Sequence, residues 1–464
     1  MTNEAGESSE ELRAFLLSTP KGVSDLLKTV AHSKRLQVLA LLLNENSKAF
    51  LTLQHDISSR NTALANHLAQ LMDKGLIERI DRGNYRITRD GKELLETAAK
   101  AYLEVSNRRY CDSEQHKKHY IEGFKSLGEF HKVEKMVHGS PEYQNCPISY
   151  LGAVTGALKG LGANADVMKV GGYSGYVFLM NVAKGGIYSS ALNFHKAWND
   201  IHKGLELFGW KIEEIKDEES FPPTHRPLNL EDTRRAKEFF ERIKAEIDQH
   251  NRPVVLWGIP TADFGIVKGY TKDSYIVSTL RRLNNQPDPP IRYDALLANR
   301  NLRAFFFREK PTFFAEHDDK KIILRAISMA KGNSYAQFGY IAGPAAFDEW
   351  ADVLEMVSKD SLSYNANSYM IMCIHESKDI AASFLHWLSE KHATKCQAIL
   401  LTSASKEYRK AEKLMQQLSL MFPRAWKGDL PLESRKKEAA ILRNVKSREL
   451  RAIELMQKSV EVWE

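Results

Sequence analysis

Cysteine is scarce in this sequence of 464 residues, and long apolar segments are missing from it. The four cysteines lie far apart without a CxxC pair, which argues against a zinc ribbon or a disulfide framework and is typical of a reducing compartment. No apolar run approaches the roughly 18 residues of a membrane span. The first residues, MTNEAGESSEEL, are acidic, whereas a secretory leader begins with basic residues. We therefore expect a cytoplasmic protein without a membrane partner, with a flexible acidic N-terminus over residues 1–19.

A strong net charge is also missing. The chain has 66 lysines and arginines against 59 aspartates and glutamates, a formal net charge of +7. This balance permits nucleic-acid binding without requiring it, so the placement of the charges matters more than their sum. Hydrophobic residues make up 43% of the chain, and no low-complexity tract indicates long disorder. A chain of this length predicts about two to four folded domains.

The pattern of residues 20–105 predicts short amphipathic helices followed by a β-hairpin. Leucines recur at helical spacing through LLKTVAHSKRLQVLALLL and NTALANHLAQLM. Ser58 and Ser59 supply the N-cap of the second of these segments, Gly75 ends its helix, and Leu76 begins a strand. The segment ERIDRGNYRIT then predicts two strands joined by a turn at residues 82–84. A helix–turn–helix followed by a hairpin is a winged helix.

A winged helix predicts where DNA contacts lie. One helix fits the major groove and presents short polar side chains to base edges, while arginines on the wing lie near phosphates. Winged helices also serve as protein–protein modules, but the wing arginines favour DNA. The candidate DNA-contacting residues are Ser59, Arg60, Asn61, Thr62, Asn66, His67, Gln70, Arg79, Arg82 and Arg86.

This segment resembles the arsenic-repressor (ArsR) type of winged-helix regulator. LLKTVAHSKRLQVLALLL is similar to that family's opening helix pair, and NHLAQLMDKGLIERI to its recognition helix and entry into the wing. The resemblance implies a homodimer that binds double-stranded operator DNA and pairs through its first and last helices, the last running from Asp90 to about Arg109. The cysteine motif that some members use to sense metals is missing from LTLQHD, so we expect no metal site there.

Residues 106–140 predict a charged helical connector. Within it, His116 and His119 are about one helical turn apart, a spacing that two metal ligands can share, and Cys111 and Asp112 lie nearby. No matching ligand pair is visible elsewhere in the sequence, and a solvated charged helix explains the composition. We therefore predict no metal and no cofactor.

Residues 141–310 alternate between helix and strand patterns. Cys146 precedes a helix predicted over about residues 147–161. The helix LEDTRRAKEFFERIKAEIDQHN precedes three apolar, β-branched segments, RPVVLWGIP, DFGIVKGYTK and DSYIVST, and KIEEI and AFFFREK add further strands. Turn residues separate these segments, which predicts an antiparallel sheet packed against the helices.

This part of the chain resembles the papain-like fold of the bacteriocin-processing cysteine peptidases, and more closely the butirosin biosynthesis protein H family. The resemblance rests on NCPISYLGAVTGALKGLG, MKVGGYSGYVF and PVVLWGIPTADFGIVKGYTKDSYIV, and further on YAQFGYIAGPAAFDEWADVLE. It covers about residues 140–460 and implies a papain-like α/β domain. In the catalytic relatives, a histidine at the start of the middle strand deprotonates the cysteine.

Cys146 is the candidate nucleophile, because the start of a helix favours a thiolate. This chain has Asp263 where the relatives have their histidine. A carboxylate raises the pKa of a neighbouring thiol, whereas an imidazolium lowers it. We therefore assign no catalytic residue, and Cys146 and Asp263 remain candidates only. Four other histidines stay open as substitutes, although each also has a packing explanation: His138, His195, His202 and His225.

The same scaffold predicts a ligand-binding cleft. Glycines permit close backbone approach, and tyrosine and tryptophan carry polar tips on apolar bodies. Asp263 would pair with an amine or a hydroxyl group. The alternative is that these residues only pack a small α/β core. The candidate ligand-binding residues are Cys146, Gly172, Tyr173, Ser174, Trp257, Asp263 and Tyr270.

Residues 311–464 keep apolar residues at helical spacing and predict a C-terminal helical bundle. The whole chain is thus expected to be α+β, with a winged helix, a central papain-like α/β domain with an antiparallel sheet, and this bundle. Two functions follow from it. The first is a DNA-binding transcriptional regulator whose papain-like domain senses a small molecule or partner. The alternative is a cysteine-dependent acyltransferase or amidohydrolase that uses Cys146 and carries an appended winged helix.

Overall fold

The structure of the chain, a computed structural model, divides into two compact units, residues 1–106 and residues 107–464. Both units combine helices with antiparallel strands, consistent with the predicted α+β class. Among the described residues, no helix is both long enough and apolar enough to cross a membrane. The structure describes residues 13, 17–43, 47–57, 61–81, 83–98, 133–188, 197–216, 229–259, 263–295, 302–310, 318–335, 339–356, 362–424 and 428–463.

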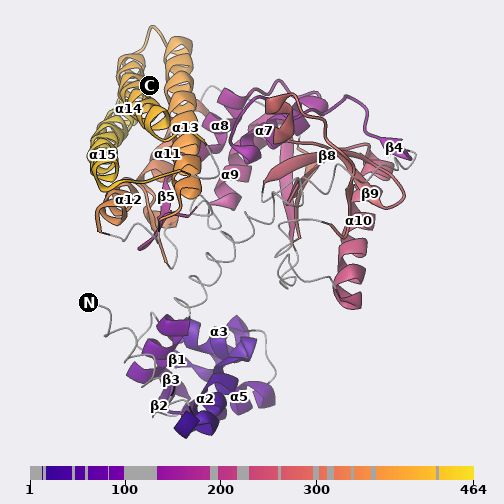
Figure 1. The fold of residues 1–464 in the computed structure, drawn as a ribbon, viewed down its shortest axis with the longest axis vertical. Helices are drawn as coiled ribbons and strands as arrows, with labels where there is room; N and C mark the ends of the chain where they lie inside the picture. The colour runs from indigo at the N-terminus through magenta and orange to yellow at the C-terminus, as the bar shows by residue number, and fades with distance from the viewer. Residues whose placement is uncertain are drawn as a thin grey trace. The chain divides into compact units, whose positions relative to one another are not determined.

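The N-terminal unit packs its helices around a leucine core and carries a small sheet (Figure 1). Its sheet has the antiparallel order β1-β3-β2. Leu39, Leu64 and Leu71 are fully buried in the core. Residues 89–98 add a further helical segment after the hairpin. The elements are α2 (Pro20–Val30), α3 (Ser33–Leu42), β1 (Lys48–Ala49), α4 (Phe50–Asp56), α5 (Asn61–Asp73), β2 (Ile77–Asp81) and β3 (Asn84–Ile87).

Gly75 ends α5 as the sequence predicts. Its φ of +67° lies in the left-handed region, where glycine carries no steric penalty. The N–H groups of Gly75 and Leu76 donate to the carbonyls of Met72 and Leu71, both at 2.9 Å, which satisfies the last carbonyls of the helix. The chain then enters β2. The predicted N-cap, Ser58 and Ser59, lies outside the described residues.

The larger unit is built around an antiparallel sheet of order β10-β9-β8-β7-β11-β6, with a short strand, β4, paired to β8. Its faces are set by strict alternation along β11: Phe305 and Phe307 enter one core, and Ala304 and Phe306 another. The strands are β4 (Lys135–Met136), β6 (Trp210–Lys216), β7 (Val254–Trp257), β8 (Phe264–Tyr270), β9 (Ser274–Ser278), β10 (Ile291–Arg292) and β11 (Arg303–Glu309).

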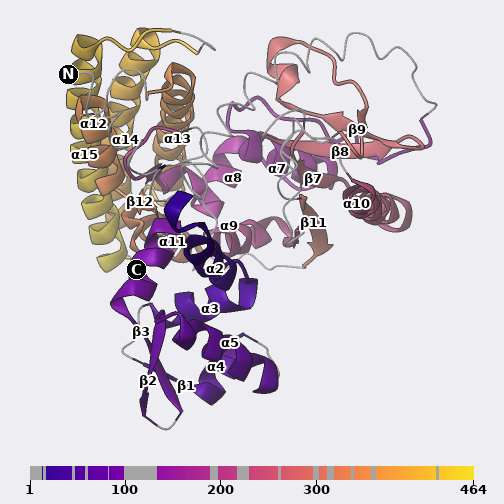
Figure 2. The same cartoon turned by 60° about the horizontal axis from the view of Figure 1, so that its bottom comes forward.

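Helices cover both faces of this sheet (Figures 1 and 2). Helix α10 (Leu230–His250) packs on one face, and α7 (Ser149–Gly160) and α9 (Trp198–Leu205) pack on the other. An Asn229–Asp232 capping box begins α10, and Asn251, at a φ of +52°, ends it. Short 3₁₀ turns lie at η2 (Tyr176–Phe178), η4 (Glu206–Phe208), η5 (Leu280–Asn284) and η6 (Asn333–Tyr335).

Helices that precede and follow the main strands of the sheet share its core. Residues of α8, α13, α14 and α15 enter the same apolar cluster as α7, so the predicted boundary at residue 310 does not separate two compact units. The helices are α8 (Val167–Ser174), α11 (Asp318–Lys331), α12 (Ala345–Met356), α13 (Tyr364–Lys391), α14 (Cys396–Met421) and α15 (Leu432–Glu461).

Two segments differ from the helices that the sequence predicts. The connector over residues 106–140 contains β4, whose Met136 pairs with Gly269 of β8; a Cβ on Gly269 would lie 2.5 Å from the Lys135 carbonyl oxygen, so the glycine admits this extra strand. Within the C-terminal helical region, β12 (Tyr340–Ala342) pairs with β5 (Asn181–Ala183). Both strands form because a distant partner satisfies their backbone groups, which local periodicity does not reveal.

Candidate functional site

The free face of α5 carries short side chains. Leu64, Leu68 and Leu71 are at most 1% exposed and fix the opposite face of the helix in the core. This burial leaves one continuous outward face of small and polar residues. Because these side chains are short, the helix can approach base edges closely. The exposed residues of this face are Asn61, Thr62, Ala65, Asn66, Ala69 and Gln70. The side-chain oxygen of Gln70 also accepts a hydrogen bond from Arg35 of α3.

Of the other predicted DNA-contacting residues, one lies partly in the interior of the unit, two lie on the hairpin, and three lie outside the described residues. His67 is half-buried, with its ring centroid 4.5 Å from that of His32, and burial lowers the pKa of His67. It therefore packs inside the unit as a neutral group. Ser59, Arg60 and Arg82 lie outside the described residues.

Two arginines remain exposed on the β2–β3 hairpin. Arg86 lies across from Glu78, and its Nη2 is 2.7 Å from a carboxylate oxygen of that residue. Arg79 donates from Nε to the backbone carbonyl of Asp81 at 3.0 Å. Because this partner is a carbonyl and not a carboxylate, the Arg79 guanidinium is more open than that of Arg86 to an ion pair with an outside anion.

Cys146 lies in the extended segment just before α7 and is fully buried. The Ile148 backbone N–H donates to its sulfur, and the Tyr143 hydroxyl donates to its carbonyl oxygen at 2.9 Å. Burial raises the pKa of the Cys146 thiol well above its usual value, and the negative charge of Glu376 raises it further. The helix start therefore does not yield a thiolate at neutral pH.

Glu376, on α13, is the residue near Cys146 that sequence reasoning missed. Its carboxyl group hydrogen-bonds to the thiol, and burial raises the pKa of Glu376. Cys373 lies one helical turn earlier on α13 and is 3% exposed; burial raises its pKa to about 12. The three-residue spacing of Cys373 and Glu376 along one predicted helix suggests that they share a face. The sequence contains no signal that Cys146 is their neighbour.

Asp263 belongs to the same neighbourhood. Burial is the largest cause of the raised pKa values of Tyr143 and Cys373, and the negative charge of Asp263 raises both further. We call Cys146, Cys373, Glu376, Asp263 and Tyr143 the thiol–carboxyl cluster. It holds two protonated thiols and two carboxyl groups, so it can donate and accept hydrogen bonds but offers no imidazole base.

Gly172, Tyr173 and Ser174 lie in α8, a helix that packs against α13. A Cβ on Gly172 would lie 2.2 Å from the ring of Phe384. The Tyr173 ring packs edge-on against Phe384, with centroids 5.8 Å apart, and Ser174 donates to the carbonyl of Gly171 at 3.1 Å. Of these predicted ligand-binding residues, Gly172 and Tyr173 thus form a helix–helix contact, and Ser174 is bonded within α8.

The structure separates Tyr270 from the other cleft residues. Tyr270 enters the core beneath α10 and donates to Asp248 of that helix at 2.7 Å, whereas Phe264 and Trp257 belong to the α7 side of the sheet. The cause is a register shift between Val267 and Gly269, because a bulge breaks the alternation that would place Phe264 and Tyr270 on one face. Trp257 is half-buried, with its ring 4.8 Å from that of Phe264.

The histidines considered as substitutes do not meet Cys146 in the described residues. The backbone N–H of His138 donates to Asn251 at 3.0 Å, beside the end of α10. His202 packs against Phe305, and burial lowers its pKa to about 3. His195 and His225 lie outside the described residues.

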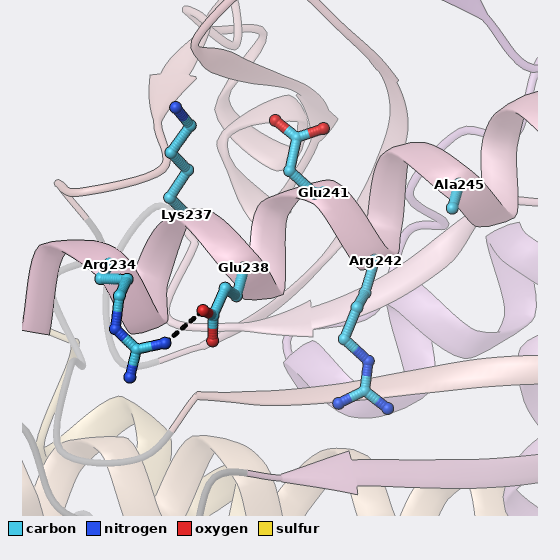
Figure 3. A pocket seen from close by; sticks show the side chains of 6 residues that line it. All are labelled: Arg234, Lys237, Glu238, Glu241, Arg242 and Ala245. Atoms are coloured by element: carbon cyan, nitrogen blue, oxygen red, sulfur yellow. Dashed lines mark hydrogen bonds and ion pairs between the residues drawn. The ribbon is translucent and has the colours of Figure 1, made fainter. Parts of the chain in front are cut away.

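A hollow of about 550 Å³ lies along α10 (Figure 3). Figure 3 shows its side chains projecting from one exposed helix, with Arg234 bonded to Glu238, and Arg234 also pairs with Glu231. A single helix face cannot enclose a ligand, so this hollow differs from a closed binding cleft. It is lined by Arg234, Lys237, Glu238, Glu241, Arg242 and Ala245.

No group of three or more metal-binding side chains is arranged to hold an ion in the part of the chain that the structure describes. The sequence candidates Cys111, Asp112, His116 and His119 lie outside that part. Comparison with models of protein families gives no match for this chain, and a search of the curated proteins gives none either.

Proposed function

We propose that this chain is a cytoplasmic, DNA-binding transcriptional regulator. The observation that carries the proposal is the free face of α5, which has small and amide side chains over a leucine-anchored core and precedes a hairpin with exposed arginines. A helix of this kind fits a major groove, and Arg79 would contact a phosphate.

The proposed N-terminal fold is a winged helix that acts as a homodimer. The succession of α4, α5 and the β2–β3 hairpin supports it. Leu17 and Leu27, at the start of this unit, are 72% and 56% exposed, and apolar side chains at those positions suit pairing of two copies through α2.

The larger unit is proposed to be a papain-like domain that senses a small molecule or partner. The antiparallel sheet between α10 and α7, with Cys146 just before α7, supports this fold. A bound small molecule would change the affinity of the protein for its operator. This change cannot exceed the difference between the ligand's affinities for the DNA-binding and the non-binding arrangement of the protein. The alternative, an acyltransferase or amidohydrolase using Cys146, finds no support in a buried thiol that faces a carboxyl group.

The test is an electrophoretic shift with the full chain and the duplex upstream of its own gene. We expect a shift at low salt. Arg79→Ala should weaken it and reduce the salt slope by about two, because the homodimer loses one phosphate contact from each subunit. Lys203→Ala, which removes an exposed charge on α9 of the larger unit, is the matched control and should leave the slope unchanged. No shift by the unmutated chain at low salt would contradict the proposal.

A further inference from the structure

An aromatic cluster lies beside α7, between that helix, α9 and the sheet. We define it as Tyr150, Trp198, His202, Phe264 and Phe305. The Tyr150 and Trp198 ring centroids are 4.8 Å apart, and the His202 and Phe305 centroids 4.7 Å apart. Phe264 and Phe305 stack at 5.3 Å. Four separate elements therefore contribute to one continuous aromatic wall.

Three polar atoms in this cluster have no hydrogen-bond partner among the described residues: the Tyr150 hydroxyl, the Trp198 Nε1 and the His202 Nε2. Their side chains belong to residues that are 1%, 5% and 6% exposed. A buried polar atom left without a partner destabilises the folded state, and native proteins seldom contain one. Three such atoms on mutually contacting rings indicate that a further molecule satisfies them.

The charges around the cluster restrict what this molecule is. The Arg303 guanidinium lies 4.9 Å from the Trp198 ring centroid and pairs with Glu214. His202 is neutral, because burial lowers its pKa to about 3 and Arg303 opposes its protonation. A cationic ligand is disfavoured, because the Arg303 guanidinium already lies over the Trp198 ring and would repel a second positive charge. The indole N–H can only donate, and the Tyr150 hydroxyl can donate as well, so the missing partner is an acceptor.

We propose that the aromatic cluster binds a small organic molecule through a carboxylate or amide carbonyl. Its carbonyl oxygen accepts hydrogen bonds from Trp198 and Tyr150, and its apolar body packs on the surrounding rings. Tyr150, the second residue of α7, follows Cys146 by four residues, and its ring stacks on that of Tyr176 with the centroids 5.3 Å apart. Tyr176 in turn interacts electrostatically with Cys146, so the site adjoins the thiol–carboxyl cluster. The regulatory role of this ligand rests on the proposed function, but its binding does not.

The test uses the full chain without DNA. Acetate, acetamide, benzoate and benzamide are titrated by calorimetry, with benzylamine as the cationic counterpart of the benzoyl probes. We expect at least one carbonyl probe to bind and to raise the unfolding temperature, because a ligand that binds the native state stabilises it. Binding by carboxylates alone, or amides alone, identifies which carbonyl the site takes. If no carbonyl probe binds, or if benzylamine binds equally well, the proposal is wrong.

Variants locate the binding. Trp198→Phe and Tyr150→Phe each keep an aromatic ring and remove one donor, so each should raise the dissociation constant about tenfold, equivalent to about 1.4 kcal/mol. Tyr275→Phe is the matched control, since the Tyr275 hydroxyl is also buried without a partner but lies on the α10 side of the sheet. An equal loss in Tyr275→Phe would contradict the assignment. Circular dichroism checks that each variant folds. If Tyr150→Phe raises the stability of the free chain and leaves probe affinity unchanged, the hydroxyl has no partner and the proposal fails.

Discussion

Cys146 shows how the surroundings of one residue decide its chemistry. The Ile148 N–H favours the thiolate, while burial and the Glu376 carboxylate oppose it, and burial is the largest of these influences. Desolvation of a fully buried thiol outweighs a single backbone donor because the charged form loses its hydration. The thiol is therefore a neutral hydrogen-bonding group in the wall of the thiol–carboxyl cluster.

We predict that Cys146 reacts slowly with iodoacetamide at pH 7 in the folded chain. Cys396 is exposed and should be labelled before Cys146. Peptide mapping by mass spectrometry after timed labelling measures both rates, with Cys396→Ala to remove the faster signal. Labelling of Cys146 as fast as that of a free thiolate would revive the enzyme alternative.

At this scale the sequence predicts some features and misses others. The sequence has Asp263 at the position where the resemblance to papain-like proteins would place a histidine, and the structure places Asp263 near Tyr143 and Cys373. Glu376 could not have been predicted as a neighbour of Cys146, because only the packing of α13 against the start of α7 brings them together.

The contact between α8 and α13 explains Gly172 at the scale of elements. Two helices approach closely there, and the Phe384 ring occupies the space that a side chain at position 172 would need. The glycine that the sequence suggested as part of a ligand cleft thus permits helix packing.

We predict that Gly172→Ala destabilises the larger unit by about 1–3 kcal/mol, the usual cost of overpacking a core. Phe384→Leu in the same chain should recover part of this loss, because it removes the ring from the clash. Denaturant unfolding followed by circular dichroism measures both changes. If the alanine variant is as stable as the unmutated chain, then the Phe384 ring does not restrict the side chain at position 172 and the prediction is wrong.

Elements were predicted best where the pattern is long and local. The β-branched segments became β7, β8 and β9, and the long amphipathic runs became α10 to α15. The bulge in β8 was not predictable, since alternation alone places Tyr270 with Phe264. Likewise β12 is short, and only its pairing with β5 makes it a strand.

A buried polar network ties three C-terminal helices together in the larger unit. Trp350 of α12 donates to Asn367 of α13 at 2.9 Å, and Asn367 donates to both carboxyl oxygens of Glu438 on α15, at 2.9 and 3.0 Å. Burial raises the pKa of Glu438 to about 8. The folded chain therefore holds a proton that the unfolded chain releases near pH 4.5.

This network predicts that stability depends on pH. Below pH 4.5 Glu438 is protonated in both states, and its contribution is fully present. As the pH rises from 4.5 to about 8 the unfolded chain binds fewer protons than the folded chain, so stability falls, by at most about 1.4 kcal/mol per pH unit. Glu438→Gln should remove this part of the slope while keeping an acceptor for Asn367. Equal slopes for both chains in denaturant unfolding at several pH values would contradict the assignment.

The whole chain joins a small unit with a free helix face to a larger unit whose apolar core contains buried polar groups. The central claim is that α5 reads DNA. It is tested most directly by fluorescence anisotropy of the full chain with two labelled duplexes at low salt, the upstream region of its own gene and a shuffled version. We predict tighter binding to the upstream duplex and loss of that preference in Asn66→Ala. Equal affinity of the unmutated chain for both duplexes, or no binding to either, would contradict the claim.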